Sequence, residues 1–123
     1  MARSHGVIVK LERFTAVLLI LRDDAPKLDE RAAAELQDAH LSHLADLHEA
    51  GYLLAAGPLL DPTFRGLSLF KVEPDRAREL AERDPAVRAG RFRLQIIPWM
   101  VHAGAMTFAR TRLPRAASEV SED

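Results

Sequence analysis

The chain has 123 residues, a formal net charge of −1 at pH 7 and no cysteine. This length suits one domain, and the absence of cysteine excludes disulfides, thiolate nucleophiles and cysteine-based metal sites. The near-neutral charge gives no electrostatic signature of a nucleic-acid-binding protein. The longest apolar run, residues 15–21, is too short to cross a bilayer, and the first residues lack the apolar segment of a secretory signal. We therefore expect a cytoplasmic protein with neither a nucleic-acid nor a membrane partner.

Alternating apolar segments and turn residues predict the secondary structure in chain order. Asp29 is predicted to cap a first helix that reaches about residue 50, because Gly51 follows it. A shorter second helix is predicted over residues 74–83. Pro98 indicates that the last strand lies at an edge of the sheet or carries a bulge. The predicted strands are residues 14–21, 52–56, 67–72 and 92–101.

The order of these elements, β-α-β-β-α-β, is typical of an α+β ferredoxin-like fold with an antiparallel four-stranded sheet. Residues 1–12 are expected to form an N-terminal arm or an extra strand, and residues 13–102 the α+β domain. Residues 103–123 are a C-terminal extension whose polar tail is predicted to be flexible. Both helices should cover one face of the sheet, which leaves an apolar face exposed. A soluble monomer rarely tolerates such a face, so we expect a homodimer formed through the sheet faces.

His40 stands in the apolar stripe of the predicted first helix. Leu36, Leu44 and Leu47 share its face at spacings of three and four residues. A histidine held there needs a partner for its ring nitrogens, because burying a polar group unpaired costs about 1–3 kcal/mol. Two interpretations stay open: a core histidine bonded to a backbone carbonyl, or a working group in a pocket.

Asp84 is the second candidate catalytic residue. Followed by Pro85, it is predicted to cap a helical turn, which is a purely structural role. Its carboxylate is also a candidate partner for His40, since both predicted helices lie on the same sheet face. A carboxylate on one imidazole nitrogen fixes the tautomer and raises the basicity of the other nitrogen, as a general base requires. The two roles are compatible because a carboxylate has two oxygens.

The other histidines do not predict a metal site. His43 and His48 point in different directions around the helix, and neither forms a zinc-binding spacing with His40. We expect these two side chains to be solvent-exposed or at the rim of a pocket, and we expect no metal. The sequence also lacks a glycine-rich phosphate loop and a Gly-x-Ser-x-Gly motif.

Several strand and turn residues are candidates for binding a substrate. Arg22, directly after the first strand, is a candidate for meeting an anionic group, although a solvated surface arginine is the commoner outcome. Leu54 and Phe70 suit either a pocket wall or the core. The remaining candidates for substrate contact are Phe14, Gly57, Pro58 and Trp99.

Four short motifs follow one another in the chain: Ala39-His40-Leu41-x-x-Leu44, Gly51-Tyr-Leu-Leu-Ala-Ala-Gly57-Pro58, Asp84-Pro85-x-Val87-x-Ala-Gly90 and Ile97-Pro98-Trp99. In this order they resemble the YCII-related family over about residues 14–99. The resemblance implies a dimeric α+β barrel of ferredoxin-like protomers. It also implies a catalytic pair in a pocket, formed here by His40 and Asp84.

The resemblance further implies a class of chemistry. One branch of the family is similar to dehydrochlorinases of aromatic breakdown, and the fold resembles that of muconolactone isomerases. Both move protons on small ring compounds without a cofactor, so we expect a cofactor-independent lyase or isomerase acting on a small molecule. Two alternatives stay open: a non-catalytic binding or interaction module, and a haem- or oxygen-dependent monooxygenase, since one fold hosts many functions. The chain departs from the family pattern in its first dozen residues and beyond Val101.

Overall fold

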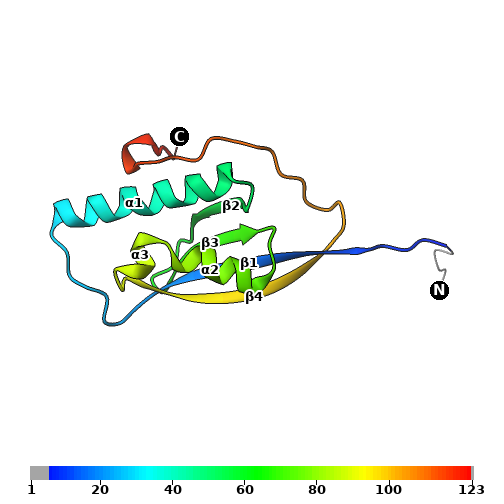
Figure 1. Cartoon of the computed structure of the whole chain (residues 1–123), viewed down its shortest axis with the longest axis horizontal. Helices are drawn as coiled ribbons and strands as arrows, with labels where there is room; N and C mark the ends of the chain where they lie inside the picture. Colours follow the sequence, from blue (N-terminus) through cyan, green and yellow to red (C-terminus); the bar gives the residue numbers. More distant parts are fainter. Residues whose placement is uncertain (1–5, 123) are drawn as a thin grey trace.

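A computed structural model describes residues 6–122 of the chain (Figure 1). Leu11 and Glu12, expected in a separate arm, belong to the first strand, and residues 6–10 before it form neither helix nor strand. Residues 1–5 of the expected arm lie outside the described part. The elements are β1 (Leu11–Leu21), α1 (Glu30–Glu49), β2 (Leu53–Pro58), β3 (Phe64–Phe70), α2 (Pro74–Glu82), α3 (Pro85–Arg88), β4 (Phe92–His102) and the short 3-10 helix η1 (Ala117–Glu119).

The four strands form one antiparallel sheet in the order β2-β3-β1-β4. The predicted ferredoxin-like α+β fold is therefore confirmed. Pro98 lies in the edge strand β4, opposite Thr15 of β1, so its edge position is also confirmed. An edge strand tolerates a proline because one side of its backbone needs no strand partner.

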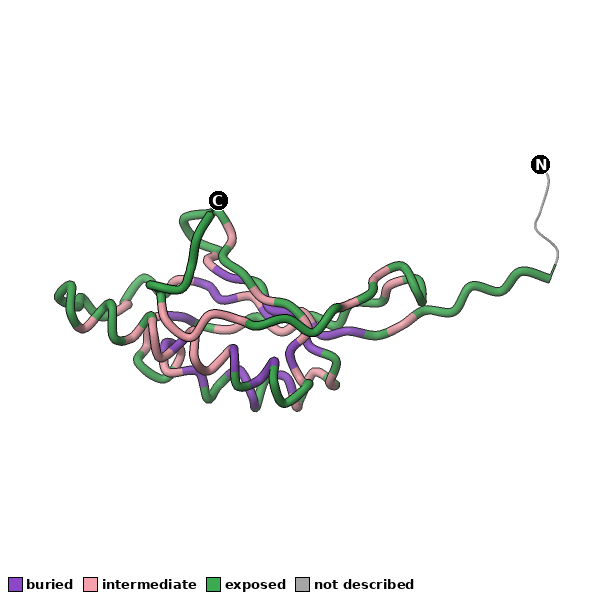
Figure 2. Tube along the Cα trace, turned by 90° about the horizontal axis from the view of Figure 1, so that it is seen from above, coloured by how far each residue is buried: buried purple, intermediate pink, exposed green. Residues whose placement is uncertain are grey.

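The helices cover one face of the sheet (Figure 1). Alternate strand residues point toward them. Val17 of β1, Leu53 of β2 and Phe70 of β3 pack there against Leu47 of α1 and Leu80 of α2. Burial is concentrated on the inner sides of the strands and helices, whereas the segment before β1 is exposed (Figure 2). This core fixes α1 and α2 side by side above the sheet.

The opposite face of the sheet, called here the open face, carries no helix. It retains large apolar side chains that are substantially exposed, among them Leu67 at 40%, Ile97 at 38% and Trp99 at 46%. Trp99 lies directly opposite Phe14 in the register of β4 and β1. The ring of Phe108, from the C-terminal extension, contacts Phe14 edge-on at 5.7 Å between centroids.

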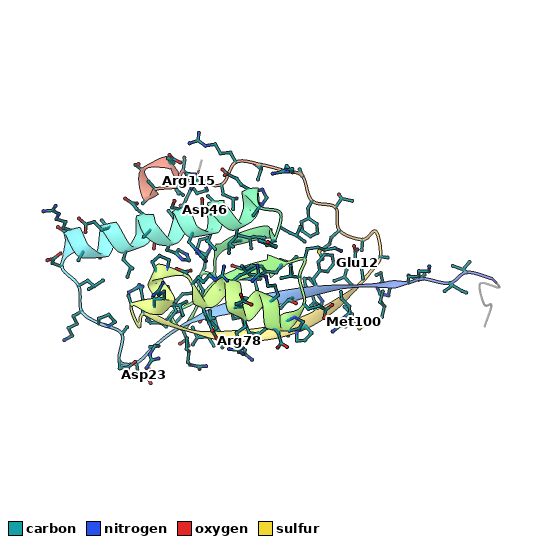
Figure 3. The ribbon with its side chains drawn as sticks, viewed as in Figure 1. Glu12, Asp23, Asp46, Arg78, Met100 and Arg115 are labelled. Atoms are coloured by element: carbon teal, nitrogen blue, oxygen red, sulfur yellow. The ribbon has the colours of Figure 1, made fainter. Side chains whose placement is uncertain are left out.

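The C-terminal extension continues from β4 and returns to α1 (Figure 1). Arg115 donates hydrogen bonds to Ser42 and to Asp46, which it approaches in Figure 3. The amide of Ala117 bonds to the carboxylate of Asp38. These contacts attach the end of the extension to the outer side of α1. Within residues 6–122, no helix has the combination of length and apolar character that crossing a membrane requires.

Candidate active site

Helix α1 positions His40 near its middle. The helix begins as predicted, because the side chain of Asp29 accepts a hydrogen bond from the amide of Ala32 at 2.7 Å. It ends before Gly51, whose φ of +88° suits glycine and reverses the chain into β2. His40 is 9% exposed, so the apolar stripe carries it into the interior.

Asp84 lies between α2 and α3 and is 3% exposed. Its Oδ1 accepts a hydrogen bond from the amide of Ala86 at 2.9 Å, which caps α3. Its Oδ2 lies 2.6 Å from Nδ1 of His40. One carboxylate therefore fulfils both roles considered from the sequence: it begins a helix and it holds the histidine ring.

The contact with Asp84 defines the tautomer of His40. An ionised carboxylate only accepts hydrogen bonds, so Nδ1 carries the proton, and in the neutral ring Nε2 keeps a lone pair. Within residues 6–122, Nε2 makes no hydrogen bond, and every buried side-chain nitrogen or oxygen there has a partner. Nε2 is therefore accessible, and it presents an acceptor to whatever enters beside it.

His40 lines a hollow of about 180 Å³ between α1 and the sheet, called here the histidine cavity. Its volume is below the 300 Å³ or more that is usual for drug-sized ligands, which limits an occupant to a small molecule. No aspartate or glutamate lines it. The lining residues are Leu19, Gln37, His40, Leu41, Leu44, Ala56, Gly57, Pro58, Arg65, Gly66, Leu67, Ser68, Arg91 and Phe92.

Gly66 shows why part of this wall lacks side chains. A Cβ at this position of β3 would lie 3.1 Å from Cδ1 of Leu19, closer than ordinary van der Waals contact. Leu19 of β1 faces Gly66 directly in the sheet register. The absence of a side chain at Gly66 thus leaves room for the Leu19 side chain in the cavity wall.

Four of the seven predicted site residues are brought together. His40, Gly57 and Pro58 line the histidine cavity, and Asp84 contacts His40 from behind it. Arg22 lies elsewhere: its guanidinium forms an ion pair with Asp24 at 2.7 Å. The hydrogen bond from Arg22 holds the pKa of the Asp24 carboxyl below its usual value.

The aromatic residues predicted to contact a substrate lie on the other side of the sheet. Trp99 lines a second hollow of about 440 Å³ on the open face, called here the apolar groove. Phe14 is buried beside Phe108, near the same face. Phe70 belongs to the core, and Leu54 is outside the histidine cavity. The lining of the apolar groove is Ala16, Ala55, Ala56, Gly57, Pro58, Leu59, Leu67, Leu69, Trp99, Met106 and Phe108.

The expected exposure of the other two helix histidines was wrong for His48. That side chain is 7% exposed, and its Nδ1 lies 2.8 Å from the carbonyl oxygen of Leu53, while Nε2 accepts a bond from the amide of Thr111. The last turn of α1 faces the start of β2, so a polar ring there finds backbone partners. His43 is half-buried, with Nε2 3.1 Å from the carbonyl oxygen of Leu80.

Arg65, Arg91 and Phe92 line the cavity but are not predicted by the sequence patterns described above. Arg91 and Phe92 directly follow the turn that begins at Asp84 and ends at Gly90. Their position in the sequence, close to a predicted site residue, could have indicated them. Nothing in the local sequence distinguishes Arg65 from a surface arginine. Among the described residues, no group of three or more histidine or acidic side chains is arranged to hold a metal ion.

Comparison with known proteins gives a family and a fold. The model of the YCII-related domain matches residues 16–100. A solved structure, a 5-chloro-2-hydroxyhydroquinone dehydrochlorinase from Burkholderia phenoliruptrix in complex with 2,5-dihydroxybenzoquinone, is similar with a TM-score of 0.53 and 20% sequence identity. The similarity covers 70% of this chain and 92% of that protein. No curated protein matches the sequence.

Proposed function

Because the chain belongs to the YCII-related family, we propose that it is a small enzyme that transfers protons on a small molecule, with His40 as general acid and base. The observation that carries this proposal is the geometry of His40. Its Nδ1 is held 2.6 Å from Asp84, and its free Nε2 is accessible beside a cavity. Asp84 acts as the positioning residue, since it contacts the ring of His40 and does not line the cavity.

The proposed step needs no cofactor. A proton on carbon or oxygen of the substrate passes to Nε2, and the electron pair of the broken bond forms a new π bond. In an elimination, a leaving group such as chloride departs with its own bonding pair. In an isomerisation, the imidazolium returns the proton to another atom of the substrate. The Asp84 carboxylate stabilises the imidazolium that forms between these steps.

A small ring compound is the substrate class that we propose. The similar solved protein is a dehydrochlorinase of a chlorinated hydroquinone and binds 2,5-dihydroxybenzoquinone. A cavity of about 180 Å³ with leucine and phenylalanine in its wall suits one ring with small substituents. The test is turnover of hydroxylated and chlorinated benzenes, followed as chloride release and as exchange of ring protons in deuterium oxide.

The matched variants for this test are His40→Asn and His43→Asn. General acid–base catalysis contributes roughly 100-fold or more to a rate, so His40→Asn should lower kcat by at least that factor. His43 lies on the same helix but bonds to a backbone carbonyl, so His43→Asn should retain turnover. Turnover by His40→Asn equal to that of the unmodified protein would remove the proposed role of His40.

The alternative function is a non-catalytic module that binds a small molecule or a partner. Asp84 also caps α3, and this observation favours the alternative. The cap gives Asp84 a structural role, so its contact with His40 needs no catalytic explanation. Titration of the His40 ring by NMR separates the two functions. A ring that stays neutral between pH 5 and 8 and whose proton does not exchange with solvent supports the module.

We also propose that the protein is a homodimer joined through the open face, giving the barrel implied by the family. The support is the exposed apolar surface of the sheet: Phe64, Leu67, Ile97 and Trp99 are each 38–46% exposed. Apolar surface of this kind commonly marks a protein interface. The cytoplasmic location expected from the sequence stays a prediction.

A further inference from the structure

Two arginines of the histidine cavity have no role in the proton transfer described above. Arg65 lies on β3, and Arg91 lies directly before β4. Both are half-buried, and both line the cavity together with His40. Two arginines from different segments of the chain therefore contribute to the wall of one small hollow.

Neither guanidinium is neutralised by the protein. Within residues 6–122, neither Arg65 nor Arg91 forms an ion pair or a side-chain hydrogen bond with an acidic residue, and the cavity wall contains no carboxylate. Asp84, the acidic residue that contacts His40, uses one oxygen for His40 and the other for the amide of Ala86. Of the other described arginines, eight form an ion pair with an acidic residue: Arg13, Arg22, Arg31, Arg76, Arg78, Arg83, Arg112 and Arg115. Arg88, Arg93 and Arg110 form none among residues 6–122, but they do not line the cavity.

The guanidinium of Arg91 packs on an aromatic ring of the cavity wall. Its guanidinium carbon lies 5.1 Å from the centroid of Phe92, an arrangement that a cation and an aromatic face favour. The ring of His40 lies 6.4 Å from the same Phe92 ring. The guanidinium and the imidazole thus both pack around one phenyl group that forms part of the cavity wall.

We propose that Arg65 and Arg91 bind an anionic oxygen group of the substrate, so that the substrate class is a small organic anion with an apolar ring or chain. This proposal rests on the proposed function and narrows its substrate. A guanidinium presents paired N–H donors that match the oxygens of a carboxylate or a phenolate. The apolar remainder of the molecule would contact Leu41 and Leu44, and His40 would meet its reacting atom from the helix side.

Uncompensated positive charge in a hollow with low-dielectric walls raises the local concentration of small anions. The same charge disfavours cations, and an uncharged molecule of the same shape leaves both guanidinium groups without an oxygen partner. Affinity should therefore depend on the charge of the ligand more than on its shape.

The test uses two probes of nearly identical shape, benzoate and benzamide, with the full-length protein. Binding is followed by the NMR shifts of the backbone amides of Gly66, Ser68 and Arg91 on titration, because these residues line the histidine cavity and not the apolar groove. We expect benzoate to shift these signals and to bind roughly tenfold or more tightly than benzamide, since hydrogen bonds to charged groups are the stronger ones. Benzoate affinity should fall as sodium chloride is added.

Three variants locate the effect. Arg65→Gln and Arg91→Gln should each weaken benzoate binding roughly tenfold and leave benzamide binding unchanged. Arg88→Gln is the matched control, because Arg88 is exposed on α3, has no acidic partner among the described residues and does not line the cavity. It should bind benzoate like the unmodified protein.

Four results would overturn the proposal. They are equal affinities for benzoate and benzamide, an Arg88→Gln variant as weak as Arg91→Gln, benzoate shifts confined to the apolar groove, and no shifts at tens of millimolar benzoate. Because binding is measured without turnover, the outcome is independent of the His40 experiment. Charge-selective binding together with full turnover by His40→Asn would support the arginine site and reject the proposed function.

Discussion

The two faces of the sheet carry two hollows of opposite character. The histidine cavity on the helix side contains two arginines, a histidine and a serine, whereas the apolar groove on the open face is lined entirely by apolar residues. The hollows share one stretch of wall, formed by residues 56–58 of β2 and by Leu67 of β3. Neighbouring residues of a strand point to opposite faces, so two environments lie one residue apart.

The two hollows suggest that the two faces of this small domain serve different functions. The helices exclude water from one face, and that burial lets a hydrogen-bonded pair such as His40 and Asp84 act in a low-dielectric setting. The apolar groove on the open face is lined by apolar residues and offers mainly apolar area. Chemistry is expected on the first face and association on the second, and the following experiments separate the two.

The largest expected effect comes from breaking the buried pair. His40→Ala leaves the carboxylate of Asp84 buried and without its hydrogen-bond partner on the histidine ring, so the free energy of unfolding should fall by about 3 kcal/mol. Urea denaturation measures this loss. His43→Ala is the control and should cost less, since that half-buried ring makes one bond to a backbone oxygen. Equal losses of unfolding free energy for both variants would mean that the His40–Asp84 contact stabilises the fold no more than an ordinary hydrogen bond to the backbone.

The second effect concerns the open face. Trp99→Lys places a charge in the centre of the proposed dimer interface and should weaken dimerisation by about 2 kcal/mol or more, as buried aromatic anchors do. Light scattering should then report a mass near the 13.7 kDa of one chain at concentrations where the unmodified protein is a dimer.

The control for this experiment is Met100→Lys. Met100 is the next residue of β4 and is 53% exposed, but it points to the opposite side of the strand. It should leave the dimer intact. A monomeric unmodified protein, or equal dissociation by both variants, would contradict the proposed interface.

The third effect tests how the C-terminal extension borders the apolar groove. Phe108 contacts Phe14 edge-on, and such aromatic pairs contribute about 1 kcal/mol beyond their buried area. A double-mutant cycle with Phe108→Leu and Phe14→Leu should therefore give a coupling energy of that size in urea denaturation. A coupling energy near zero would show that the extension does not pack on the sheet in solution.

The smallest effect is the pH response of the turn that joins β2 to β3, the two strands that form the shared wall. The amides of Phe64 and Thr63 donate hydrogen bonds to the carboxylate of Asp61, which lowers its pKa from the ordinary 3.8. A lowered pKa in the folded state stabilises the protein above pH 3.8, and this stabilisation is lost as the pH falls through the lower, folded-state pKa. Asp61→Ala should thus lower the melting temperature slightly at pH 7 and no longer at strongly acidic pH. An equal decrease at both pH values would exclude this mechanism.

Much of the fold could be predicted because its signals are local. Asp29 and Gly51 mark the ends of α1 by capping and by a left-handed backbone, and short apolar runs bounded by turn residues mark the strands. His40 was recognisable as a buried histidine because its helical periodicity is also local. These features depend on neighbours within one or two turns of chain.

The cavity wall could be predicted only in part because it depends on register. Phe14 and Trp99 were assigned to the substrate pocket, yet the pairing of β1 with β4 places them near or on the open face. A shift of one residue in the pairing of two strands moves every side chain of a strand to the other face of the sheet. When a strand is apolar on both sides, its sequence does not indicate which side chains face the helices. Arg65 depended on the same long-range pairing.

The two oxygens of Asp84 make two different hydrogen bonds, and this has a consequence for how position 84 can change in evolution. One side chain begins α3 through Ala86 and sets the direction of the hydrogen bond to His40. Asparagine would preserve the cap but would offer an N–H to Nδ1, which favours the tautomer that carries its proton on Nε2. Glutamate would displace both contacts by one methylene. We therefore expect selection for folding and selection on the histidine to act on the same codon, so that fewer substitutions are accepted at position 84 than at a residue that makes only one of these contacts.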